Sequence, residues 1–462
     1  MQMTDITDAR RATSKDGLFV GIDIGSSALH YIVLDAERSV VYSAKPIMHF
    51  ANPLGALAEA WGDLRARFGR EAIRSTALTG SAAESFPTVM DGAIYVYDSV
   101  AIPKGAEVIA PAARHIFHIG AKDAYFFHIG ATGGRQVIRE WRTGTKCGGG
   151  SGMLIEKQCR RLFQGEVPSP ELEDAAVAAD DGQRSAIAIR NRLRLQERVE
   201  EMFQRAEKEA GQSKEPSEFL ARCGVVVQSD LIHKQNEGAT RVDNLAGLFR
   251  TVARNYVIDV LGSSEFSSNG AGDAVATGGV FSNDLVRAGL AQLLGTAITR
   301  PQHHDNVAAA GAALKAMEEG NTFVLELKLL DKVAEHSRQK RVFAPPLSES
   351  LARVQERTEE LAARIPAGTE VVLGIDGGST TTKGALVEIA TGKLLDKLYI
   401  KTHGNPEESL KRVLRYLARH QDNVVVKGVG ATGSARKLYE KILLSQKKSQ
   451  ALADRGLVLV DL

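Results

Sequence analysis

Three glycine-rich turns carry the residues best suited to bind a phosphate chain. The first, residues 21–27 (GIDIGSS), places Asp23 at the end of an apolar run and before a Gly/Ser turn. The second, 118–123 (HIGAKD), ends in Asp123, and the third, 276–280 (ATGGV), lies between an apolar run and a helix-like run. Such turns offer backbone N–H groups to phosphate oxygens, while a carboxylate orients hydrated Mg²⁺. Each turn alone is also common as plain structure, so their order carries the information.

The order of the turns resembles that of the hexokinase–actin–chaperone ATPase superfamily, in which two phosphate turns precede an adenosine turn. The sequence has no G-x-x-x-x-G-K-[ST] motif, so it is not a P-loop protein. It also lacks a G-x-G-x-x-G turn that opens a helix before a ribose-binding acid, so a dinucleotide fold is not supported.

Two of the three cysteines precede helix-like runs. Cys147 lies in KCGGGSG, directly before MLIEKQCRRLF, and Cys223 opens CGVVVQSDLI. A thiolate at a helix start is stabilised by the helix dipole and by free N–H groups. Two such cysteines are too few for a metal site, but a homodimer would supply the four that an iron–sulfur cluster or a structural zinc needs. By composition alone, cysteines such as these are more often plain core residues, and Cys159, in mid-helix, is predicted to be one.

These motifs together resemble the BadF/BadG/BcrA/BcrD-type ATPase family, the 2-hydroxyacyl-CoA dehydratase activators and benzoyl-CoA reductase ATPase subunits. KCGGGSG is similar to K-C-A-A-G-T-G, and Cys223 with Ser229-Asp230 is similar to C-x-x-x-x-x-S-E. In family order, IGAKDA resembles I-G-G-Q-D-A-K, ATGGVFSN resembles T-G-G-V-A-x-N, and AGAAL at 310–314 resembles part of G-A-L-G-A-A-L. The resemblance spans residues 18–316 and returns as a half copy over 371–462, as in a piece of a large tandem CoA-activase.

The resemblance implies an actin/hexokinase-like α/β ATPase of two ribonuclease-H-like halves. It implies a 4Fe–4S cluster shared across a homodimer, and ATP hydrolysis that drives low-potential electrons from a ferredoxin-like donor into a CoA-thioester reductase or dehydratase. Cys147 and Cys223 would be the cluster ligands. The remaining assignments put Asp23 and Asp123 at the Mg²⁺–phosphate site, Gly25, Ser26, Ser27 and Gly120 around the phosphates, Gly278 and Gly279 at the adenosine, and Glu107 beside the attacking water.

Several positions depart from the family pattern. His30 stands where a lysine is usual, whereas the second copy keeps Lys383. Lys122 brings a cation to the second phosphate turn. A charged insertion over 165–218 separates the two cysteines, and its Leu, Val, Met, Phe and Ala spacing near 195–206 predicts an amphipathic helix. We expect this insertion to be a surface elaboration.

An internal repeat shows which elements must position the turns. The segment from residue 18 returns from residue 371 at one offset of 353 residues, and each copy reads as a β-hairpin followed by a βαβ crossover. Four landmarks share the offset: Gly21 and Gly374, Asp23 and Asp376, the Asn-Pro pairs at 52 and 405, and the TGS triplets at 79 and 432.

The predicted domain order follows from the repeat. We expect a disordered tail over 1–17, a first ATPase subdomain over 18–110, and a second over 111–320 that carries the cysteines and a return helix. A linker over 321–370 and a partial second module over 371–462 complete the chain. That second module lacks its own second phosphate turn and adenosine turn, so we expect no ATP binding by it alone.

Composition excludes other classes of protein. The chain has 462 residues with 58 Lys+Arg against 56 Asp+Glu, a net charge of +2, which does not favour nucleic-acid binding through a broad basic face. No apolar run is long enough to cross a membrane, and three cysteines fit a reducing compartment, so a cytoplasmic location is expected. Two alternatives remain open: a small-molecule (sugar) kinase of the same superfamily, and a non-catalytic regulatory ATPase-like module.

Overall fold

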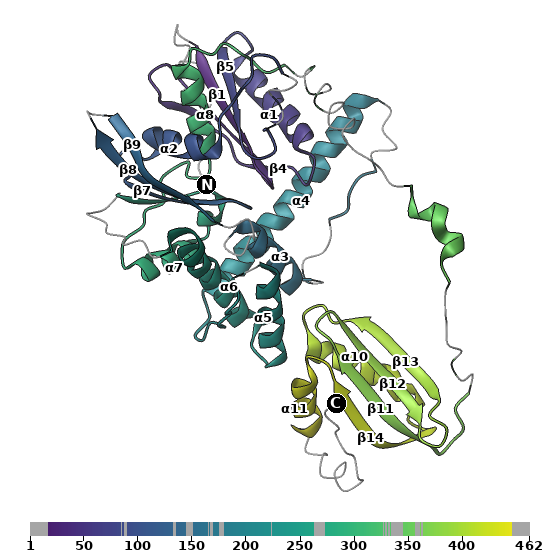
Figure 1. The fold of residues 1–462 in the computed structure, drawn as a ribbon. Helices are drawn as coiled ribbons and strands as arrows, with labels where there is room; N and C mark the ends of the chain where they lie inside the picture. Colours follow the sequence, from purple (N-terminus) through teal and green to yellow (C-terminus); the bar gives the residue numbers. More distant parts are fainter. Residues whose placement is uncertain are drawn as a thin grey trace.

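Three β-sheets form within the described residues and position the predicted turns (Figure 1). The computed structural model describes residues 17–445 except 85, 87–89, 133–134, 145–150, 165, 167–169, 175–179, 223, 263–272, 327, 329, 331–332, 334–344, 356–360 and 362–363. None of the helices in this described part combines the length and apolarity needed to cross a membrane.

The first lobe is built on the sheet of strand order β3-β2-β1-β5-β6, with β4 paired to β2. Helix α1 packs on one face of this sheet, and α8 packs on the other face against β1, β2 and β5, with α2 outside it. The elements are β1 (Leu18–Ile24), β2 (Ala28–Leu34), β3 (Val40–Ser43), β4 (Ile47–Met48), α1 (Pro53–Phe68), β5 (Ile73–Thr79), β6 (Ile94–Tyr95), α2 (Asp98–Ile109) and α8 (Val307–Glu318).

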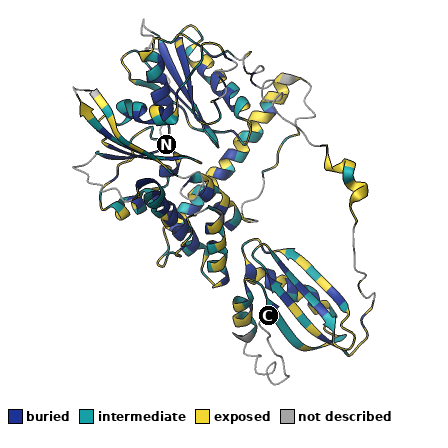
Figure 2. Ribbon diagram, viewed as in Figure 1, coloured by how far each residue is buried: buried dark blue, intermediate teal, exposed yellow. Residues whose placement is uncertain are grey.

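Small residues allow α8 to lie directly on β1. A Cβ at Gly21 would fall 1.8 Å from the carbonyl oxygen of Ala309, so only glycine fits there. A glycine also allows α2 and α8 to pack closely, because a Cβ at Gly311 would lie 1.8 Å from the oxygen of Ala101. Alternate β1 residues face the opposite side and pack in a core with α1 (Figure 2). Both faces of β1 are therefore buried, and its last residues are held rigidly at the end of the strand where the first turn begins.

The second lobe contains the sheet β10-β7-β8-β9 covered by helices. Its largest core cluster joins that sheet to α3, α4, α5, α6 and α7, with Phe249 and Tyr256 among the fully buried side chains. The elements are β7 (His115–Ile119), β8 (Ala124–Thr132), β9 (Arg135–Thr143), α3 (Gly152–Leu162), α4 (Asp181–Ala210), α5 (Gly224–Asn236), α6 (Arg241–Tyr256), the π-helix η3 (Val257–Leu261), β10 (Ala274–Thr277), the 3-10 helix η4 (Gly279–Ser282) and α7 (Asp284–Leu294).

A second copy of the first sheet follows a segment that contains the 3-10 helix η5 (Leu347–Arg353). Its strand order β13-β12-β11-β14 matches β3-β2-β1-β5, and its register pairs Asp376 with Lys383 as β1 and β2 pair Asp23 with His30. Strand pairing thus repeats at the 353-residue offset. The elements are β11 (Thr369–Gly377), β12 (Thr381–Glu388), β13 (Leu394–Lys401), α10 (Pro406–Leu417), η6 (Ala418–His420), β14 (Val424–Thr432) and α11 (Arg436–Ser445).

This second copy is covered on one face only in the part of it that the structure describes. Helices α10 and α11 both pack on the face that carries Ile375, whereas the face of Gly374 is open (Figure 2). A Cβ at Gly374 would meet nothing within 4 Å, although Gly21 at the corresponding position is covered by α8. The counterpart of α2 would be residues 451–462, which lie outside the described residues.

Candidate nucleotide site

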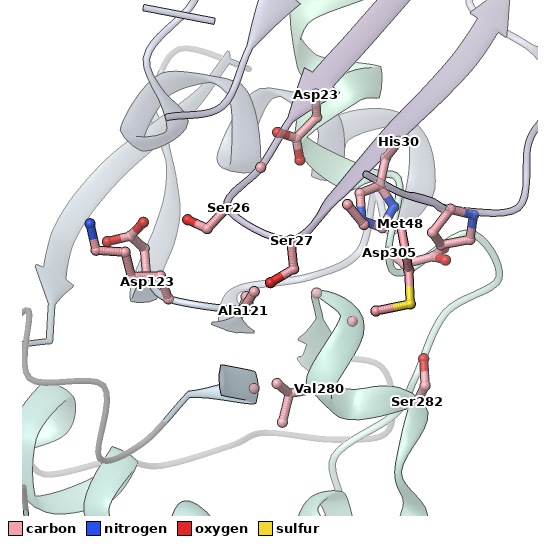
Figure 3. A pocket seen from close by; sticks show the side chains of 18 of the residues that line it. Asp23, Ser26, Ser27, His30, Met48, Ala121, Asp123, Val280, Ser282 and Asp305 are labelled. Atoms are coloured by element: carbon pink, nitrogen blue, oxygen red, sulfur yellow. The ribbon is translucent and has the colours of Figure 1, made fainter. Parts of the chain in front are cut away.

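A cavity of about 540 Å³ lies between the two lobes and joins all three predicted turns (Figure 3). Strand ends of both lobes line it, because β1 and β5 end on one side while β7 and β10 end on the other. Eight of the predicted site residues line the cavity together: Asp23, Gly25, Ser26, Ser27, Gly120, Asp123, Gly278 and Gly279.

The first turn holds Asp23 in a buried position at the end of β1. The turn closes through a hydrogen bond from the N–H of Gly25 to the oxygen of Ala28, at 3.0 Å. Gly80, with φ +90°, lies so close that a Cβ there would come within 2.2 Å of Asp23 Oδ1. Burial, and then the nearby charge of Asp98, raises the pKa of Asp23 well above its usual value. These surroundings disfavour the charged form of this carboxylate, and a nearby cation would favour it.

Asp98 is a cavity residue that was not predicted from the sequence. It opens α2, lines the cavity, and accepts a hydrogen bond of 3.0 Å from Thr79 Oγ1. Burial raises its pKa, against the Thr79 hydrogen bond, and the charge of Asp123 raises it further. Only a weak pattern in the sequence points to Asp98. Like Asp23, it is an acid at the end of an apolar run, here residues 94–97.

The three carboxylates suit a hydrated divalent cation. The charge of Asp98 raises the pKa of Asp23, and the charge of Asp123 raises the pKa of Asp98, so the group lacks a positive charge that Mg²⁺ would supply. Within the described residues no three His, Cys, Asp or Glu side chains converge closely enough to chelate a metal directly. Mg²⁺ typically keeps several waters and is bound through one or two carboxylates and the phosphates of a nucleotide.

The second turn is bonded directly to the start of α3. Its own turn closes from the N–H of Gly120 to the oxygen of Asp123 at 2.8 Å. The N–H of Gly152 then donates to the oxygen of Gly120 at 3.1 Å, and that of Met153 to the oxygen of Ala121 at 2.8 Å. A Cβ at Gly152 would lie 3.3 Å from Ala121 Cα and 3.0 Å from Val280, so α3 begins pressed between the second and third turns.

The third turn requires glycine at position 278. Gly278 has φ +89°, and a Cβ there would lie 2.4 Å from the oxygen of Ile119. A Cβ at Gly279 would instead meet nothing within 4 Å, although this residue lines the cavity. Helix α7 follows, capped by Asn283, whose side chain accepts from the N–H of Val286 at 3.0 Å. Open space beside Gly279 is what a nucleoside would fill.

On the first-lobe side of the cavity, His30 stands where the family pattern has a lysine, and His118 and His304 lie nearby. Burial lowers the pKa of His30, with Asp305 opposing and His304 adding to this effect, so the imidazole is neutral at pH 7. Burial, with the neighbouring His30 and His304, also lowers the pKa of His118 to about 3. His304 Nε2 lies 3.0 Å from Ser282 Oγ, which turns it away from its neighbour His303 and toward the third turn.

Two predicted elements lie elsewhere. Glu107 is not among the cavity-lining residues: it forms an ion pair of 2.9 Å with Lys104, which also pairs with Glu318 of α8 at 2.7 Å. Lys104 therefore links α2 to α8 and pairs with Glu107 at the same point, and the role of Glu107 beside an attacking water stays a prediction. The insertion, expected to be a surface elaboration, places a face of α4 against the cavity.

Of the three cysteines, Cys159 is the one that lies within the described residues. Cys147 and Cys223 lie outside the described residues, and the helices that follow them, α3 and α5, begin at Gly152 and Gly224. Cys159 is fully buried in the second-lobe core, and burial raises the pKa of its thiol to about 12. A thiol this hard to ionise is a packing residue, as its mid-helix position predicts.

The fold and the cavity together define an actin/hexokinase-like nucleotide-binding protein, with two lobes, strand-end carboxylates and three glycine turns around one cavity. The chain belongs to the BadF/BadG/BcrA/BcrD ATPase family, whose sequence model matches residues 20–316.

Three known proteins are similar over the same region. The chain is 26% identical to the (R)-2-hydroxyglutaryl-CoA dehydratase activating ATPase of Acidaminococcus fermentans over 303 residues, 65% of this chain and 97% of that protein. It is 24% identical to the activator of lactoyl-CoA dehydratase of Anaerotignum propionicum over 304 residues, with the same coverage of each chain. The crystal structure of the A. fermentans (R)-2-hydroxyglutaryl-CoA dehydratase component A matches with a TM-score of 0.50 and 22% identity, over 66% of this chain and 98% of that one. This last likeness supports the fold.

Proposed function

We propose that this chain is an ATP-dependent activator that drives low-potential electrons into a CoA-thioester dehydratase, or into a reductase of the benzoyl-CoA reductase type. In this proposal ATP and Mg²⁺ occupy the cavity between the lobes, and a 4Fe–4S cluster is shared by two copies of the chain. The names of the two sequence relatives, both dehydratase activators, favour the dehydratase. A ferredoxin-like donor and a reducing cytoplasmic setting belong to the same proposal.

The observation that carries the proposal is the bonding between the second turn and α3. Two backbone hydrogen bonds join Gly120 and Ala121 to Gly152 and Met153. Cys147 precedes Gly152 by five residues in the chain. A change of ligand at the turn of Asp123 is therefore passed through main-chain contacts to the segment that carries a proposed cluster ligand. A kinase has no use for paired cysteines at helix starts, which favours the activator over the kinase.

The chain before the second cysteine is also fixed. Asp230 accepts hydrogen bonds from the N–H groups of Leu220 and Ala221, each at 2.8 Å, and Arg254 donates to the oxygens of Phe219 and Ala221. Asp230, the acid of the second cysteine motif, therefore holds the stretch of chain that enters α5. A cluster bound by Cys147 and Cys223 would supply reversible one-electron chemistry beside two helix N-termini, whose dipoles favour its negative charge.

The residues of the cavity would carry out the ATP hydrolysis that the proposed function requires. The cavity carboxylates Asp23, Asp98 and Asp123 would orient hydrated Mg²⁺ at the phosphates, and the glycine turns would offer N–H groups to the phosphate oxygens. His30 is neutral, so on the first-lobe side charge compensation must come from Mg²⁺ rather than from a lysine.

The test is anaerobic purification with iron and sulfide analysis, light scattering and nucleotide binding. We expect four irons per dimer. Cys147→Ser and Cys223→Ser should lose iron and electron transfer but keep ATP binding, because the nucleotide turns belong to separate strand ends. Cys159→Ser is the matched control and should keep the cluster.

Three outcomes would contradict the proposal. Iron-free protein that phosphorylates a sugar would indicate the kinase, and iron-free protein without turnover would indicate a regulatory module. A strictly monomeric protein with a complete four-iron cluster would refute the shared site.

A further inference from the structure

Helix α4 of the insertion presents a polar stripe to the cavity. Five of its residues line the cavity at the spacing of one helical face: Gln196, Glu200, Phe203, Gln204 and Glu207. The third turn and the start of α7 line the same cavity, and Glu207 of the stripe contacts the start of α7 directly. The stripe holds two carboxylates and one aromatic ring, and the first two turns with Lys122 also line this cavity.

The N-terminal half of α4 is attached to the first lobe. Arg192 makes a two-pronged ion pair with Glu59 of α1, at 2.8 Å from Nε and 2.6 Å from a terminal nitrogen, and both side chains are mostly buried. Gln196 donates to the oxygen of Pro46 at 2.9 Å and accepts from the N–H of Met48 at 3.1 Å. These contacts hold α4 to the β4 region, over the opening between the lobes.

The C-terminal half of α4 belongs to the second lobe. Val199, Met202 and Ala206 are buried in the core that includes α3 and α6. Glu207 accepts a hydrogen bond of 2.6 Å from the N–H of Asp284 at the start of α7, so one of its oxygens is used there. One helix therefore bridges both lobes and forms part of the cavity between its two attachments, as the diagonal course of α4 in Figure 1 shows.

We propose that α4 forms the ribonucleoside wall of the ATP site and latches the two lobes over the bound nucleotide. Carboxylate oxygens of Glu200 and Glu207 accept hydrogen bonds from ribose hydroxyls, and the ring of Phe203 packs on the base. The same carboxylates repel a phosphate chain, so they orient the nucleotide with its phosphates toward the glycine turns. Leaving the cavity then requires the Arg192–Glu59 pair and the Gln196 contacts to break. This inference rests on the proposed ATP binding.

The wall is tested by calorimetric titration with ATP, with 2′-deoxy-ATP and with inorganic tripolyphosphate. Glu200→Gln and Phe203→Ala should each weaken ATP binding about tenfold, the worth of one charged hydrogen bond or one ring contact, and should change tripolyphosphate binding less than twofold. Glu200→Gln should also reduce the preference for ATP over 2′-deoxy-ATP. Glu197→Gln, on the same helix but not among the cavity-lining residues, is the control. Because Glu200 is exposed to the cavity, its variant tests the wall even if Phe203→Ala fails to fold.

The latch is tested by the rate of ATP release in stopped-flow chase experiments. Arg192→Ala and Glu59→Ala should each speed release about fivefold. The double variant should release ATP no faster than Arg192→Ala alone, because Glu59 contacts α4 through Arg192, whereas Arg192 also donates to Gln196. Arg190→Ala, which breaks an exposed pair with Glu173 on the same helix, should leave release unchanged.

The outcomes separate this inference from the proposed function. Wild-type protein that binds no ATP would refute the proposed function. Wild-type binding together with unchanged Glu200→Gln and Phe203→Ala variants would refute the wall, and additive effects in the Arg192/Glu59 pair would refute the latch.

Discussion

The two copies of the repeated sheet place the same carboxylate in opposite environments. Asp23 is buried, faces Asp98 and lies opposite a neutral His30. Asp376, its counterpart, has 36% of its side chain exposed and pairs with Lys383 at 2.6 Å. The local turn is nevertheless the same, since Gly80 and its counterpart at 433 both have φ near +90° and approach the carboxylate. The repeated sequence therefore produces the same turn in both copies, whereas the second lobe and α8 give the carboxylate of the first copy its distinct surroundings.

The largest expected difference between the copies is at the glycine under α8. Gly21→Ala should destabilise the first lobe by about 3 kcal/mol or more, because its Cβ would clash with the main chain of Ala309. Gly374→Ala should be neutral or stabilise by up to about 1 kcal/mol, because the position is open and alanine loses less backbone entropy. Denaturant unfolding of both variants checks this. Equal losses would mean that a helix also covers the second copy.

The next difference concerns turnover of ATP. Asp23→Asn should lower the ATPase rate about 100-fold, because it removes the carboxylate that we propose to orient Mg²⁺ at the phosphates. Asp376→Asn should leave the rate within about twofold, since its surroundings lack the second and third turns in the described part of that copy. Steady-state assays on both variants, with circular dichroism as a folding control, decide the matter. A comparable loss in Asp376→Asn would show that the second copy takes part in hydrolysis.

A smaller effect is expected from relieving the buried charge of Asp98. Its pKa is raised above 3.8 in the folded protein, so ionisation destabilises the nucleotide-free fold. This penalty is absent below pH 3.8, grows as the pH rises toward the raised pKa, and is complete above it. Asp98→Asn should therefore raise the melting temperature at pH 7 by about 2–4 °C, and the gain should vanish near pH 4. A gain that persists at pH 4 would point to packing instead of charge.

The smallest effects should be equal in the two copies. Asn52 caps α1 by accepting from the N–H of Gly55 at 3.1 Å, and Asn405 caps α10 by accepting from the N–H of Glu408 at 3.0 Å. Substitution of either asparagine by alanine should cost about 1 kcal/mol in the stability of its own copy. Hydrogen exchange, which follows each copy separately, measures both. Unequal costs would show that the repeat differs even in its local helix signals.

Local signals in the sequence predicted much of this molecule, and contacts across long sequence distances account for what was missed. The strand ends, the three turns and the amphipathic core face of α4 all follow from short patterns, and Val199, Met202 and Ala206 are indeed buried. The polar face of α4 was misassigned because side chains that face a cavity have the same periodicity as side chains that face solvent. Asp98 was missed because its partnership with Asp23 exists only after 75 residues of chain fold back. Glu107 was expected beside the attacking water, but it forms an ion pair with Lys104, three residues earlier on the same helix, and it is not among the cavity-lining residues.

The open face of the second copy has a consequence for colloidal behaviour. An uncovered sheet face is a surface on which other sheets can stack, and proteins that carry one need charges to prevent association. Alternation along β11 puts Glu370 and Asp376 on the face of Gly374, and each carries a cation of its own: Lys427 at 2.9 Å and Lys383 at 2.6 Å. The two positions whose residues, Asp23 and His30, line the cavity in the first copy thus place an ion pair, Asp376 with Lys383, on the open face of the second copy, where we expect it to oppose sheet stacking.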